Sequence, residues 1–367
     1  MFKDFEIENG TGSAIIVGAS LSGLMTAIAL AETGMNVTVV EKTGSKPRNG
    51  AALQVDSGET DYTLTAQYLR KLASDGKKSV EAWSSVQLRL REAAMGNPKI
   101  KLRYSTMITS IGEDGHCAWI EIEKGEILRA EILIGADGYR SKVRKHVSNG
   151  NCNSVFTGYM IWVAILEEKD IAEQYRPGLH TTFDMPNGIG DFLLGSVIAG
   201  ADGSKAAGER RLSWAWYDNT RNDLLRETGC VEGNMVKHSL NAPDIPERTL
   251  TELAMQASVR WPQPWLAATL HSINSRNLTG IPVTEYVPDA LVKGRVVLVG
   301  DAAHVITPLT AMGFNASLED AATLADCISK ERNLDKAAAL LQYESKRLKV
   351  VQNLVKSGQS FSRSFGR

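Results

Sequence analysis

Six residues near the N-terminus, Gly18 to Gly23, have the spacing of a loop that binds the pyrophosphate of a dinucleotide. Gly18 allows a tight turn, Gly23 lets the following helix pack closely, and the helix N-terminus offers free N–H groups. Glu41 follows at the expected distance of about 20 residues and can accept hydrogen bonds from a ribose 2′-hydroxyl. Ser20 replaces the usual middle glycine, so its side chain could crowd the pyrophosphate or donate a hydroxyl to it. The alternative is a structural turn that binds no nucleotide.

A second polar segment, Gly300-Asp301-Ala302-Ala303-His304, follows a buried apolar stretch more than 250 residues later. Asp301 therefore stands at the carboxyl end of a predicted strand, where open α/β sheets bind ligands, and it can hold a polyol hydroxyl. Pro308 and Gly313 shape the loop that leads into the next helix. The N-terminus of that helix would stabilise negative charge on a ligand. Taken alone, Asp301 could instead be a helix cap.

A third segment is Gly135-Ala136-Asp137-Gly138, with Ser141 and Arg144 following. On its own it is better explained as a turn before a solvated basic helix.

These segments require an α/β arrangement of strands and helices. Apolar periodicity predicts a helix from about residue 21 that ends before Gly34, and helices over 63–72 and 79–94. A further helix begins near 313–315, and one or two amphipathic helices follow residue 335. Short buried strands are predicted over 14–17, 37–40, 132–134 and 295–299.

From about Phe156 the pattern changes to alternation. In RRLSWAWYDN, Leu212, Trp214 and Trp216 share one face, a period of two that is typical of half-buried antiparallel strands. We therefore predict a Rossmann-like cofactor-binding domain formed by 1–155 and 266–335. An inserted substrate domain, α+β with a mostly antiparallel sheet, would span 156–265, and a C-terminal helical segment 336–367.

Composition narrows the class of protein. The 367 residues suggest about two domains. The 41 basic and 42 acidic residues give a net charge of −1, which argues against a nucleic-acid-coating protein. Four cysteines without a C-x-x-C pair predict free thiols in a reducing cytoplasm and no metal site. The uncharged stretch 11–31 has the length of a membrane span, but a buried strand and its crossover helix explain it better. The acidic residues in 1–10 are wrong for a secretory signal.

Together the motifs GxSxxG plus Glu, GADGxxSxxR and GDAAHxxxP…GxN resemble the class A FAD-dependent aromatic-ring monooxygenases related to para-hydroxybenzoate hydroxylase. The middle segment, with TGYMIW and ERRLSWAWY, looks most like the dihydroxypyridine hydroxylases. The resemblance covers nearly the whole chain in the right order.

The resemblance implies FAD in the N-terminal site, with Asp137, Gly138 and Arg144 serving both FAD and the incoming NADH or NADPH. Gln87 matches a position where many relatives have an arginine, and Arg48 is a further candidate. Pro308 and the loop 309–313 would line the isoalloxazine ring, although Thr310 occupies a position where relatives have glycine. The full set of expected cofactor residues is Gly18, Ser20, Leu21, Ser22, Gly23, Glu41, Lys42, Arg48, Gln87, Asp137, Gly138, Arg144, Gly300, Asp301, Gly313 and Asn315.

The activity implied by the resemblance is hydroxylation of a small aromatic or heteroaromatic compound. NAD(P)H would reduce the flavin, O2 would add at C4a, and the flavin hydroperoxide would transfer one oxygen to the ring. The protein must orient the substrate and exclude water. The catalytic candidates are Pro308, His304, His180 and Tyr217, of which His304 has a structural alternative and His180 could simply be exposed. Possible substrate-wall residues, most of which should be core, are Tyr159, Trp162, His180, Phe183, Phe192, Trp214, Trp216 and Tyr217.

Other functions remain open at this level. Val163 replaces an arginine of the relatives, so their substrate anchor need not be present. A flavin oxidoreductase that does not hydroxylate is one alternative, and a redox-silent flavin protein that holds a ligand is another, suggested by Ser20 and Thr310. The basic segment 330–367 is expected to be a helix docked on the FAD domain, with a dimer contact or a membrane-surface contact as alternatives. The chain would be a monomer or a homodimer.

Overall fold

A six-stranded sheet carries the three glycine-containing segments. The computed structural model describes residues 12–45, 51–56, 63–74, 78–123, 125–150, 152–176, 182–184, 191–330 and 335–366. All neighbouring pairs in this sheet are parallel except β17–β18. Its strands, in spatial order, are β17 (Val292–Lys293), β18 (Val296–Leu298), β9 (Ile132–Gly135), β1 (Ser13–Val17), β2 (Asn36–Val40) and β5 (Ile100–Arg103).

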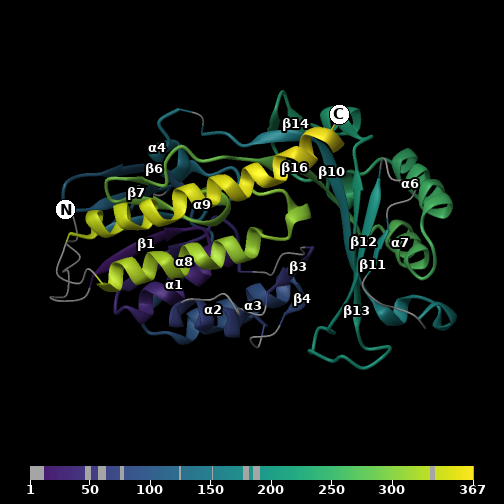
Figure 1. The fold of residues 1–367 in the computed structure, drawn as a ribbon, viewed down its shortest axis with the longest axis horizontal. Helices are drawn as coiled ribbons and strands as arrows, with labels where there is room; N and C mark the ends of the chain where they lie inside the picture. Colours follow the sequence, from purple (N-terminus) through teal and green to yellow (C-terminus); the bar gives the residue numbers. More distant parts are fainter. Residues whose placement is uncertain are drawn as a thin grey trace.

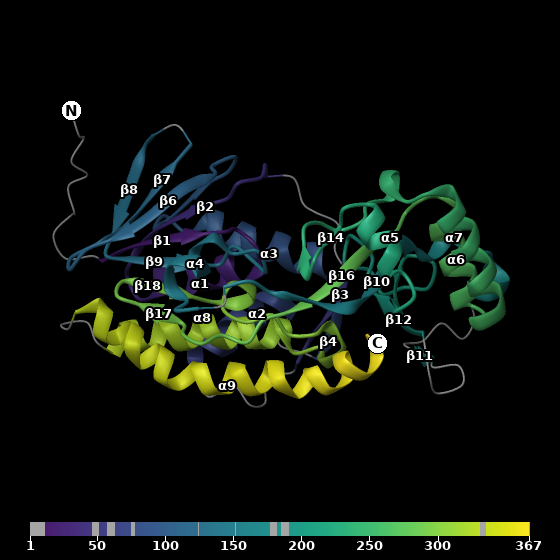
Figure 2. The ribbon, with the colours of Figure 1, turned by 90° about the horizontal axis from the view of Figure 1, so that it is seen from above.

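Helices pack around this sheet. Helix α1 is buried along almost its whole length, because it lies between the sheet and α8. This burial explains the uncharged stretch near the N-terminus, and no helix in the described ranges combines the length and apolar character needed to cross a membrane. The long α9 runs along the α/β half and reaches the second sheet (Figures 1 and 2). The main helices here are α1 (Leu21–Glu32), α2 (Leu64–Ser74), α3 (Trp83–Gly96), α4 (Lys142–Val147), α8 (Gly313–Lys330) and α9 (Lys336–Phe365).

The alternating segment forms a five-stranded antiparallel sheet, as expected for the fold class. Helices α6 (Glu247–Arg260) and α7 (Trp265–Asn274) cover the face that points away from the α/β half (Figure 1). The strands, in spatial order, are β11 (Thr182–Asp184), β12 (Phe192–Ile198), β13 (Arg211–Asp218), β10 (Val155–Glu167) and β16 (Thr279–Glu285). The division into domains remains a prediction, but β16 pairs with β10, so the return to the α/β half falls later in the chain than residue 266.

Smaller elements complete the structure. The helix predicted over 79–94 was wrong at its start, because Ser79–Ala82 pairs with Ala52–Val55 as a two-stranded sheet and the helix begins at Trp83. A three-stranded antiparallel sheet and several short elements were not predicted. These elements are β3 (Ala52–Val55), β4 (Ser79–Ala82), β6 (Ile108–Glu113), β7 (Ala118–Ile122), β8 (Ile127–Ala130), α5 (Asn222–Glu227), β14 (Val231–Glu232) and β15 (Met235–Val236).

Candidate active site

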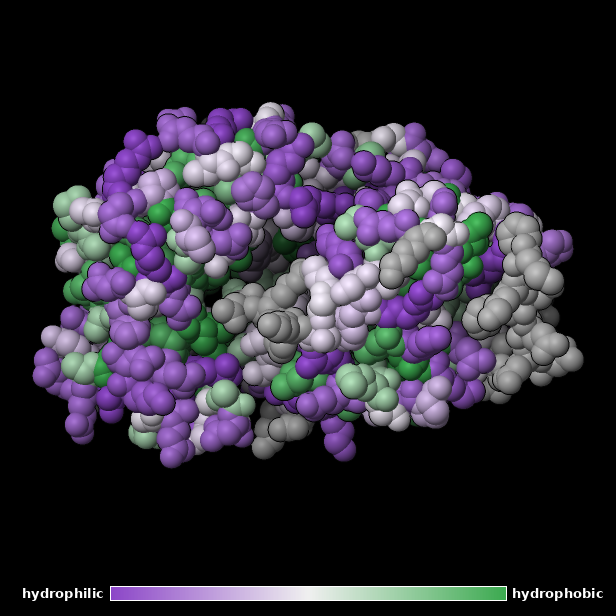
Figure 3. Space-filling model, turned by 180° about the vertical axis from the view of Figure 1, so that it is seen from behind, coloured by the Kyte–Doolittle hydropathy of each residue, from purple (hydrophilic) through white to green (hydrophobic). Residues whose placement is uncertain are grey.

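A large cavity lies between the six-stranded sheet and the antiparallel sheet. Its volume is about 1390 Å³, above the roughly 300–1,000 Å³ of pockets that hold drug-sized ligands. The molecular surface is visibly hollowed near the middle of the view in Figure 3. The cavity therefore has room for a dinucleotide together with a small ring. Seven of the expected cofactor residues line it: Gly18, Ser20, Glu41, Lys42, Asp137, Gly138 and Asp301.

The turn from β1 into α1 depends on glycine at two positions. Gly18 has a φ of +108°, and a Cβ there would lie 2.3 Å from the carbonyl oxygen of Ala136. A Cβ on Gly23 would lie 1.9 Å from the carbonyl oxygen of Gly18. Ser20 is exposed and makes no side-chain capping bond, so its hydroxyl does not compete with the backbone N–H groups that begin α1. The turn thus offers the backbone cradle that a pyrophosphate requires. Leu21 and Ser22 are buried beneath it.

Glu41 joins this turn to the end of β2. Its Oε2 accepts a hydrogen bond of 3.0 Å from the backbone N–H of Ala19, and its Oε1 accepts one of 2.9 Å from the N–H of Thr43. The Thr43 hydroxyl also donates to Oε1 at 2.7 Å, and together these contacts fix the carboxylate at the cavity wall. Lys42 lies next to it on the same wall. The ribose contact itself remains a prediction.

Asp137 organises the turn between β9 and α4. Its Oδ1 accepts a hydrogen bond from the Ser141 hydroxyl, and its Oδ2 accepts one of 2.6 Å from the N–H of Lys142. Burial raises the pKa of the Asp137 carboxyl, although these donors oppose the shift. Gly138 has a φ of +80°, which lets the chain turn along the cavity wall.

Arg144 differs from the direct cofactor contact that we expected. Its side chain is completely buried, and its Nε donates to the carbonyl oxygen of Ala302 at 2.7 Å. Its Nη1 donates to the Tyr139 carbonyl at 2.9 Å, and its Nη2 donates to the Asp301 carbonyl. The guanidinium also lies 4.1 Å from the ring centroid of Tyr286. Burial lowers the pKa of Arg144. Arg144 therefore positions the Asp301 backbone from behind.

Asp301 presents its side chain to the cavity at the end of β18. The surrounding protein desolvates the Asp301 carboxyl and raises its pKa, while the charges of His304 and Arg144 oppose this increase. Gly300 has a φ of +59°, and a Cβ there would lie 2.5 Å from the Cβ of Ser22. The glycine therefore lets the Asp301 loop approach the start of α1, which brings two motifs 280 residues apart in sequence to one site.

His304 is not among the residues that line the cavity, which favours its structural alternative, and its catalytic role stays a prediction. It is buried, and its Nε2 lies 2.7 Å from Oδ2 of Asp320 on α8. Oδ1 of Asp320 accepts a bond of 2.9 Å from Nε of Arg347 on α9, and Oδ2 also accepts one from the Gly300 N–H. Burial would raise the pKa of the Asp320 carboxyl, but His304 and Arg347 lower it to about 2. The sequence analysis missed Asp320 and Arg347. The pattern that could have revealed them is a charged residue on the apolar face of each predicted helix.

In the loop from Pro308 to Gly313, the position that favours glycine is Ala311 and not Thr310, where we expected it. Thr310 lies in a single 3-10 turn, where its hydroxyl donates to the Thr307 carbonyl at 3.0 Å. Ala311 is the residue in the left-handed region, with a φ of +53°. Glycine would be favoured at Ala311, so Thr310 does not disturb the loop. Pro308 is exposed, and its contact with an isoalloxazine ring remains a prediction.

Gln87 and Asn315, two further expected cofactor residues, are not among those that line the cavity. Gln87 on α3 is buried, and its Oε1 has no hydrogen-bond partner within the described ranges. Asn315 binds Arg70 at 2.7 Å and Asp56 at 2.9 Å, which ties α8 to α2 and β3. The sequence analysis missed the buried Arg70. Arg48 lies outside the described residues.

The two faces of the antiparallel sheet separate the aromatic candidates. Trp162, Trp214 and Trp216 point toward α6 and α7 and belong to the core. Two of them bond within that core, since Nε1 of Trp162 donates to Asp218 at 3.1 Å and Nε1 of Trp214 to Ser272 at 3.1 Å. The cavity is lined instead by smaller residues of β10 and β16: Val163, Ala164, Ile165, Thr279 and Ile281.

Tyr217 lies on the inner face of the sheet but is not among the residues that line the cavity, so its catalytic role stays a prediction. Its ring stacks on Phe192 with centroids 4.2 Å apart, in a cluster closed by Phe361 and Phe365 of α9. Burial raises the pKa of the Tyr217 hydroxyl. His180, and the side chain of Phe183, lie outside what the structure describes.

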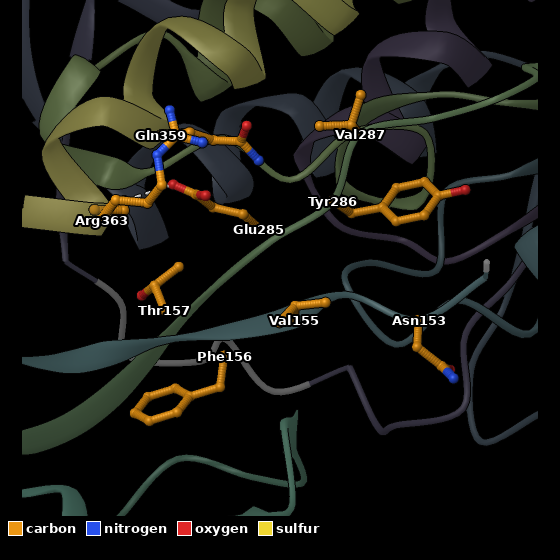
Figure 4. Close-up of a pocket in the computed structure, with 10 residues that line it drawn as sticks. Asn153, Val155, Phe156, Thr157, Glu285, Tyr286, Val287, Gln359 and Arg363 are labelled. Carbon is orange, nitrogen blue, oxygen red and sulfur yellow. Dashed lines mark hydrogen bonds between the residues drawn. The ribbon is translucent and has the colours of Figure 1, made fainter. Parts of the chain in front are cut away.

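A smaller cavity of about 440 Å³ lies between β10, β16 and the end of α9. Figure 4 shows Glu285 pointing toward Gln359 and Arg363 of α9. The Ser362 hydroxyl donates to Glu285 at 2.6 Å and lies 3.4 Å from the Tyr159 hydroxyl, which in turn lies 2.7 Å from the Thr307 hydroxyl. These contacts fasten the C-terminal helix to the loop that precedes Pro308.

Comparison with known proteins identifies the family. The profile described as an FAD binding domain matches residues 12–60 and 174–358, more than half of the chain. The chain is 24% identical to 2,6-dihydroxypyridine 3-monooxygenase of Paenarthrobacter nicotinovorans, over 92% of this chain and 87% of that protein. It is 23% identical to 3-hydroxybenzoate 6-hydroxylase of Klebsiella oxytoca, over 96% and 88% respectively.

Solved structures share the fold. The structure of 2,6-dihydroxypyridine-3-hydroxylase from Arthrobacter nicotinovorans superposes with a TM-score of 0.77 at 21% identity, covering 96% of this chain and 92% of that one. HpxO of Klebsiella pneumoniae, complexed with FAD and uric acid, superposes with a TM-score of 0.71 at 20% identity, covering 96% and 88%.

A dinucleotide turn, an aspartate at the end of a parallel strand and an antiparallel sheet meet at one cavity. Together with the family match and the relatives, they identify a class A flavoprotein monooxygenase. The chain belongs to the FAD-binding domain family, which includes FAD-dependent aromatic hydroxylases, and FAD is its cofactor.

Proposed function

We propose that this protein uses NADH or NADPH and O2 to hydroxylate a small aromatic or heteroaromatic compound. The observation that carries the proposal is the continuous cavity from Gly18 and Glu41, through Asp301, to the apolar wall of Val163 and Ile281. FAD supplies the redox chemistry and the oxygen transfer when it is bound. The chain supplies binding, orientation and exclusion of water.

The residues present fit FAD. The backbone at Gly18 and Gly23 has no room for a side chain, as expected where a pyrophosphate approaches the helix N-terminus. Glu41 would hold the adenosine ribose, and Asp301 would hold the ribitol hydroxyls. The apolar side chains of β10 and β16 would keep water from the reacting ring.

Basic side chains support the use of a dinucleotide reductant. Arg140, Lys142 and Lys145, close together in sequence, line the same cavity, and a local group of positive side chains attracts the phosphates of a dinucleotide. The four cysteines are free, which fits the cytoplasmic location that we propose.

The redox-silent alternative loses its motivation. Ser20 lines the cavity with an exposed side chain that makes no capping bond, and Thr310 adopts an ordinary turn conformation, so neither residue distorts the backbone that would hold the cofactor. The flavin oxidoreductase that does not hydroxylate differs from the proposal only in its product.

The test is NAD(P)H consumption by the FAD-loaded protein with hydroxypyridines, phenols and larger aromatic compounds. We expect consumption to rise with a true substrate and to match the amount of hydroxylated product. NAD(P)H oxidation that yields only hydrogen peroxide with every compound would contradict hydroxylation. A purified chain that binds no FAD under any reconstitution condition would contradict the proposal as a whole.

A further inference from the structure

The loop that leads into α8 is bonded to a side chain of the antiparallel sheet. Thr307, the residue before Pro308, is buried, and its hydroxyl oxygen lies 2.7 Å from that of Tyr159 on β10. Tyr159 is itself completely buried, and its ring meets the rings of Phe361 and Phe365 of α9 edge to face, at centroid distances of 6.0 and 5.1 Å. Three segments that are far apart in the sequence therefore meet at one pair of hydroxyl groups.

Helix α9 approaches this loop where the helix has a glycine. A Cβ on Gly358 would lie 2.3 Å from Cγ2 of Thr307 and 3.4 Å from Cγ2 of Thr310. Ser362 follows one turn later on the same face of the helix. The missing side chain at Gly358 lets α9 come close enough for the Ser362 hydroxyl oxygen to lie 3.4 Å from that of Tyr159.

These hydroxyl groups and the Glu285 carboxylate form one chain of contacts. The Ser362 hydroxyl donates to Oε1 of Glu285 at 2.6 Å. Each hydroxyl has one proton, and an ionised carboxylate only accepts. Because the proton of Ser362 goes to Glu285, all three contacts can be hydrogen bonds only if Thr307 donates to Tyr159 and Tyr159 donates to Ser362. An ionised Glu285 therefore sets the direction of every hydroxyl in the chain.

The outer end of the chain lies at the smaller cavity. Figure 4 shows Glu285 pointing toward Gln359 and Arg363 of α9. Burial raises the pKa of the Glu285 carboxyl, while Ser362, Gln359 and Arg363 oppose this increase. The side chains of one helix thus favour the ionised form that orients the hydroxyl groups.

The strand that holds Thr307 also forms part of the wall of the large cavity. Tyr159 and Val163 belong to one cluster on the inner face of the sheet, and Val163 lines the large cavity. Leu309 of the loop packs against the same cluster. The loop is therefore held to the same strand that forms the cavity wall.

We infer that Tyr159 is a positioning residue for the proposed reaction. Its hydroxyl bond to Thr307 sets the place of the Pro308 loop relative to the sheet that would orient the substrate. The inference rests on the proposed function, in which Pro308 lines the isoalloxazine ring of FAD. Oxygen transfer needs the substrate ring and the flavin in one fixed geometry, and a displacement of about 1 Å can cost about 100-fold in rate.

The first experiment measures hydrogen exchange in the FAD-loaded Tyr159→Phe variant, which keeps the ring and loses only the hydroxyl. Mass spectrometry follows the amides of Thr310 and Ala311, which donate to the carbonyls of Thr307 and Pro308 at 3.2 and 3.0 Å. We expect both amides to exchange about fivefold faster than in the wild type, because the loop loses one buried hydrogen bond. The visible spectrum of the bound flavin should shift as well. Unchanged exchange together with an unchanged spectrum would overturn the inference.

Turnover gives the second readout. In Tyr159→Phe we expect kcat for hydroxylated product to fall about tenfold, with hydrogen peroxide accounting for the remaining NAD(P)H consumed. The KM of the aromatic substrate and the Kd of FAD should stay within about twofold, since the cavity wall and the dinucleotide turn are unaltered. A fall in product that is matched by an equal loss of FAD affinity would show a merely structural role and contradict the inference.

Tyr343→Phe is the matched control for Tyr159→Phe. Tyr343 is also completely buried, and its hydroxyl donates to the Leu298 carbonyl at 3.0 Å, away from the loop. Its loss should lower thermal stability by a similar amount and leave the loop exchange and the product yield unchanged. Equal changes in both variants would reduce the role of Tyr159 to general stability and overturn the inference.

Two substitutions at Thr307 test the bond from its other end and do not depend on the folding of Tyr159→Phe. Thr307→Val keeps the shape of the side chain and removes the hydroxyl, so it should reproduce the faster exchange and the lower product yield. Thr307→Ser keeps the hydroxyl and should retain most of the product yield. Equal yields in these two variants would contradict a role for the hydroxyl bond.

The readouts separate this inference from the proposed function. A protein that hydroxylates with the same yield in the wild type and in Tyr159→Phe would contradict only the positioning role. A protein that inserts no oxygen into any ring would contradict the proposed hydroxylation, while loop exchange and the flavin spectrum would still decide whether Tyr159 positions the loop.

Discussion

The cofactor half and the substrate half of the cavity are built in different ways. On the cofactor side the main chain makes the site, since Gly18 and Gly23 approach other backbone atoms, and Gly300 approaches the Ser22 side chain, at distances that exclude a Cβ. On the substrate side the site consists of side chains on one face of an antiparallel sheet, among them Val163 and Arg211. The first kind of site leaves a local sequence motif, whereas the second depends on which face of the sheet meets the cavity. Changes on the cofactor side should therefore abolish binding, and changes on the substrate side should alter selectivity.

The largest loss of stability is expected at Asp320, in the buried network behind the cofactor half of the cavity. Asp320→Asn removes the buried negative charge between Arg347 and His304 and replaces one of the two accepting oxygens with a donor, and breaking such a buried pair costs about 3–5 kcal/mol of unfolding free energy. Urea denaturation measures the loss. Asp326→Asn, on the same helix and partly exposed, is the control and should cost less than about 1 kcal/mol. A loss of similar size in both variants would contradict the role of the buried network.

The same carboxyl predicts an acid limit. The pKa of Asp320 is lowered to about 2 in the folded protein, so the unfolded chain binds a proton more readily. The stabilisation is therefore complete above about pH 4 and is lost as the pH falls toward 2. Denaturation midpoints measured between pH 5 and 2 should converge for the wild type and Asp320→Asn at the acid end.

On the substrate side, the two faces of the sheet should respond differently. Trp216→Ala removes a buried ring that packs on Trp261 and should cost about 3–5 kcal/mol, with FAD affinity unchanged. Val163→Ala, at the cavity wall, should cost less than about 1.5 kcal/mol and change substrate KM more than stability. Denaturation and steady-state kinetics of both variants test this, and the reverse pattern would show that the substrate lies on the other face.

At the dinucleotide turn, Gly23→Ala should weaken FAD binding by about 100-fold, equivalent to about 2.7 kcal/mol, because the new Cβ displaces the Gly18 carbonyl. Gly34→Ala, at the other end of α1, is the matched control. It has a φ of +102° and open space around it, so it should cost about 1 kcal/mol of stability and leave FAD affinity unchanged. Fluorescence titration of FAD decides between them. Equal affinities in the two variants would exclude the turn as the pyrophosphate site.

Asp301→Asn should have a smaller effect on the cofactor. It keeps the shape of the side chain but removes the charge from a hydrogen bond to a hydroxyl, which we expect to weaken FAD binding about tenfold, or about 1.4 kcal/mol. The unfolding free energy of the FAD-free protein should stay within about 0.5 kcal/mol. Unchanged FAD affinity would contradict the role assigned to Asp301.

The smallest expected effect is a gain in stability. Ala311→Gly relieves a left-handed residue, which costs about 1–2 kcal/mol for a non-glycine side chain, and adds about 0.5–1 kcal/mol of chain entropy to the unfolded state. We expect a net stabilisation of about 0.5 kcal/mol, visible in the thermal midpoint. Thr310→Gly is the comparison and should destabilise, since its hydroxyl bond to the Thr307 carbonyl is lost.

The sequence was sufficient for the parts of the fold that obey local rules. The β1–α1–β2 unit follows from buried apolar runs and from Gly18, Gly23 and Gly34, and the structure places it within one or two residues of the prediction. The alternation around Trp214 and Trp216 likewise predicted a half-buried strand. The helix start at residue 79 was misplaced, because a strand pairing with β3 across 25 residues outweighs local periodicity.

The candidate site was less predictable, because its contacts join distant segments. Arg144 and His304 lie within the right motifs, but only their long-range contacts, those of Arg144 with the loop after β18 and those of His304 with α8, show that they are buried behind the cavity. Periodicity showed that Trp214 and Trp216 share a face but not which layer covers that face. Arg211 was not selected, because a single arginine in a basic segment carries no signal until the cavity is seen.

The central claim is most directly tested by oxygen isotope labelling of the product. The FAD-loaded protein would turn over with NAD(P)H and a heteroaromatic substrate under ¹⁸O2, and mass spectrometry would follow both the product and the hydrogen peroxide. Our account predicts that each NAD(P)H oxidised yields one product molecule that carries a single ¹⁸O atom. A product without the label, or label found only in hydrogen peroxide, would contradict it.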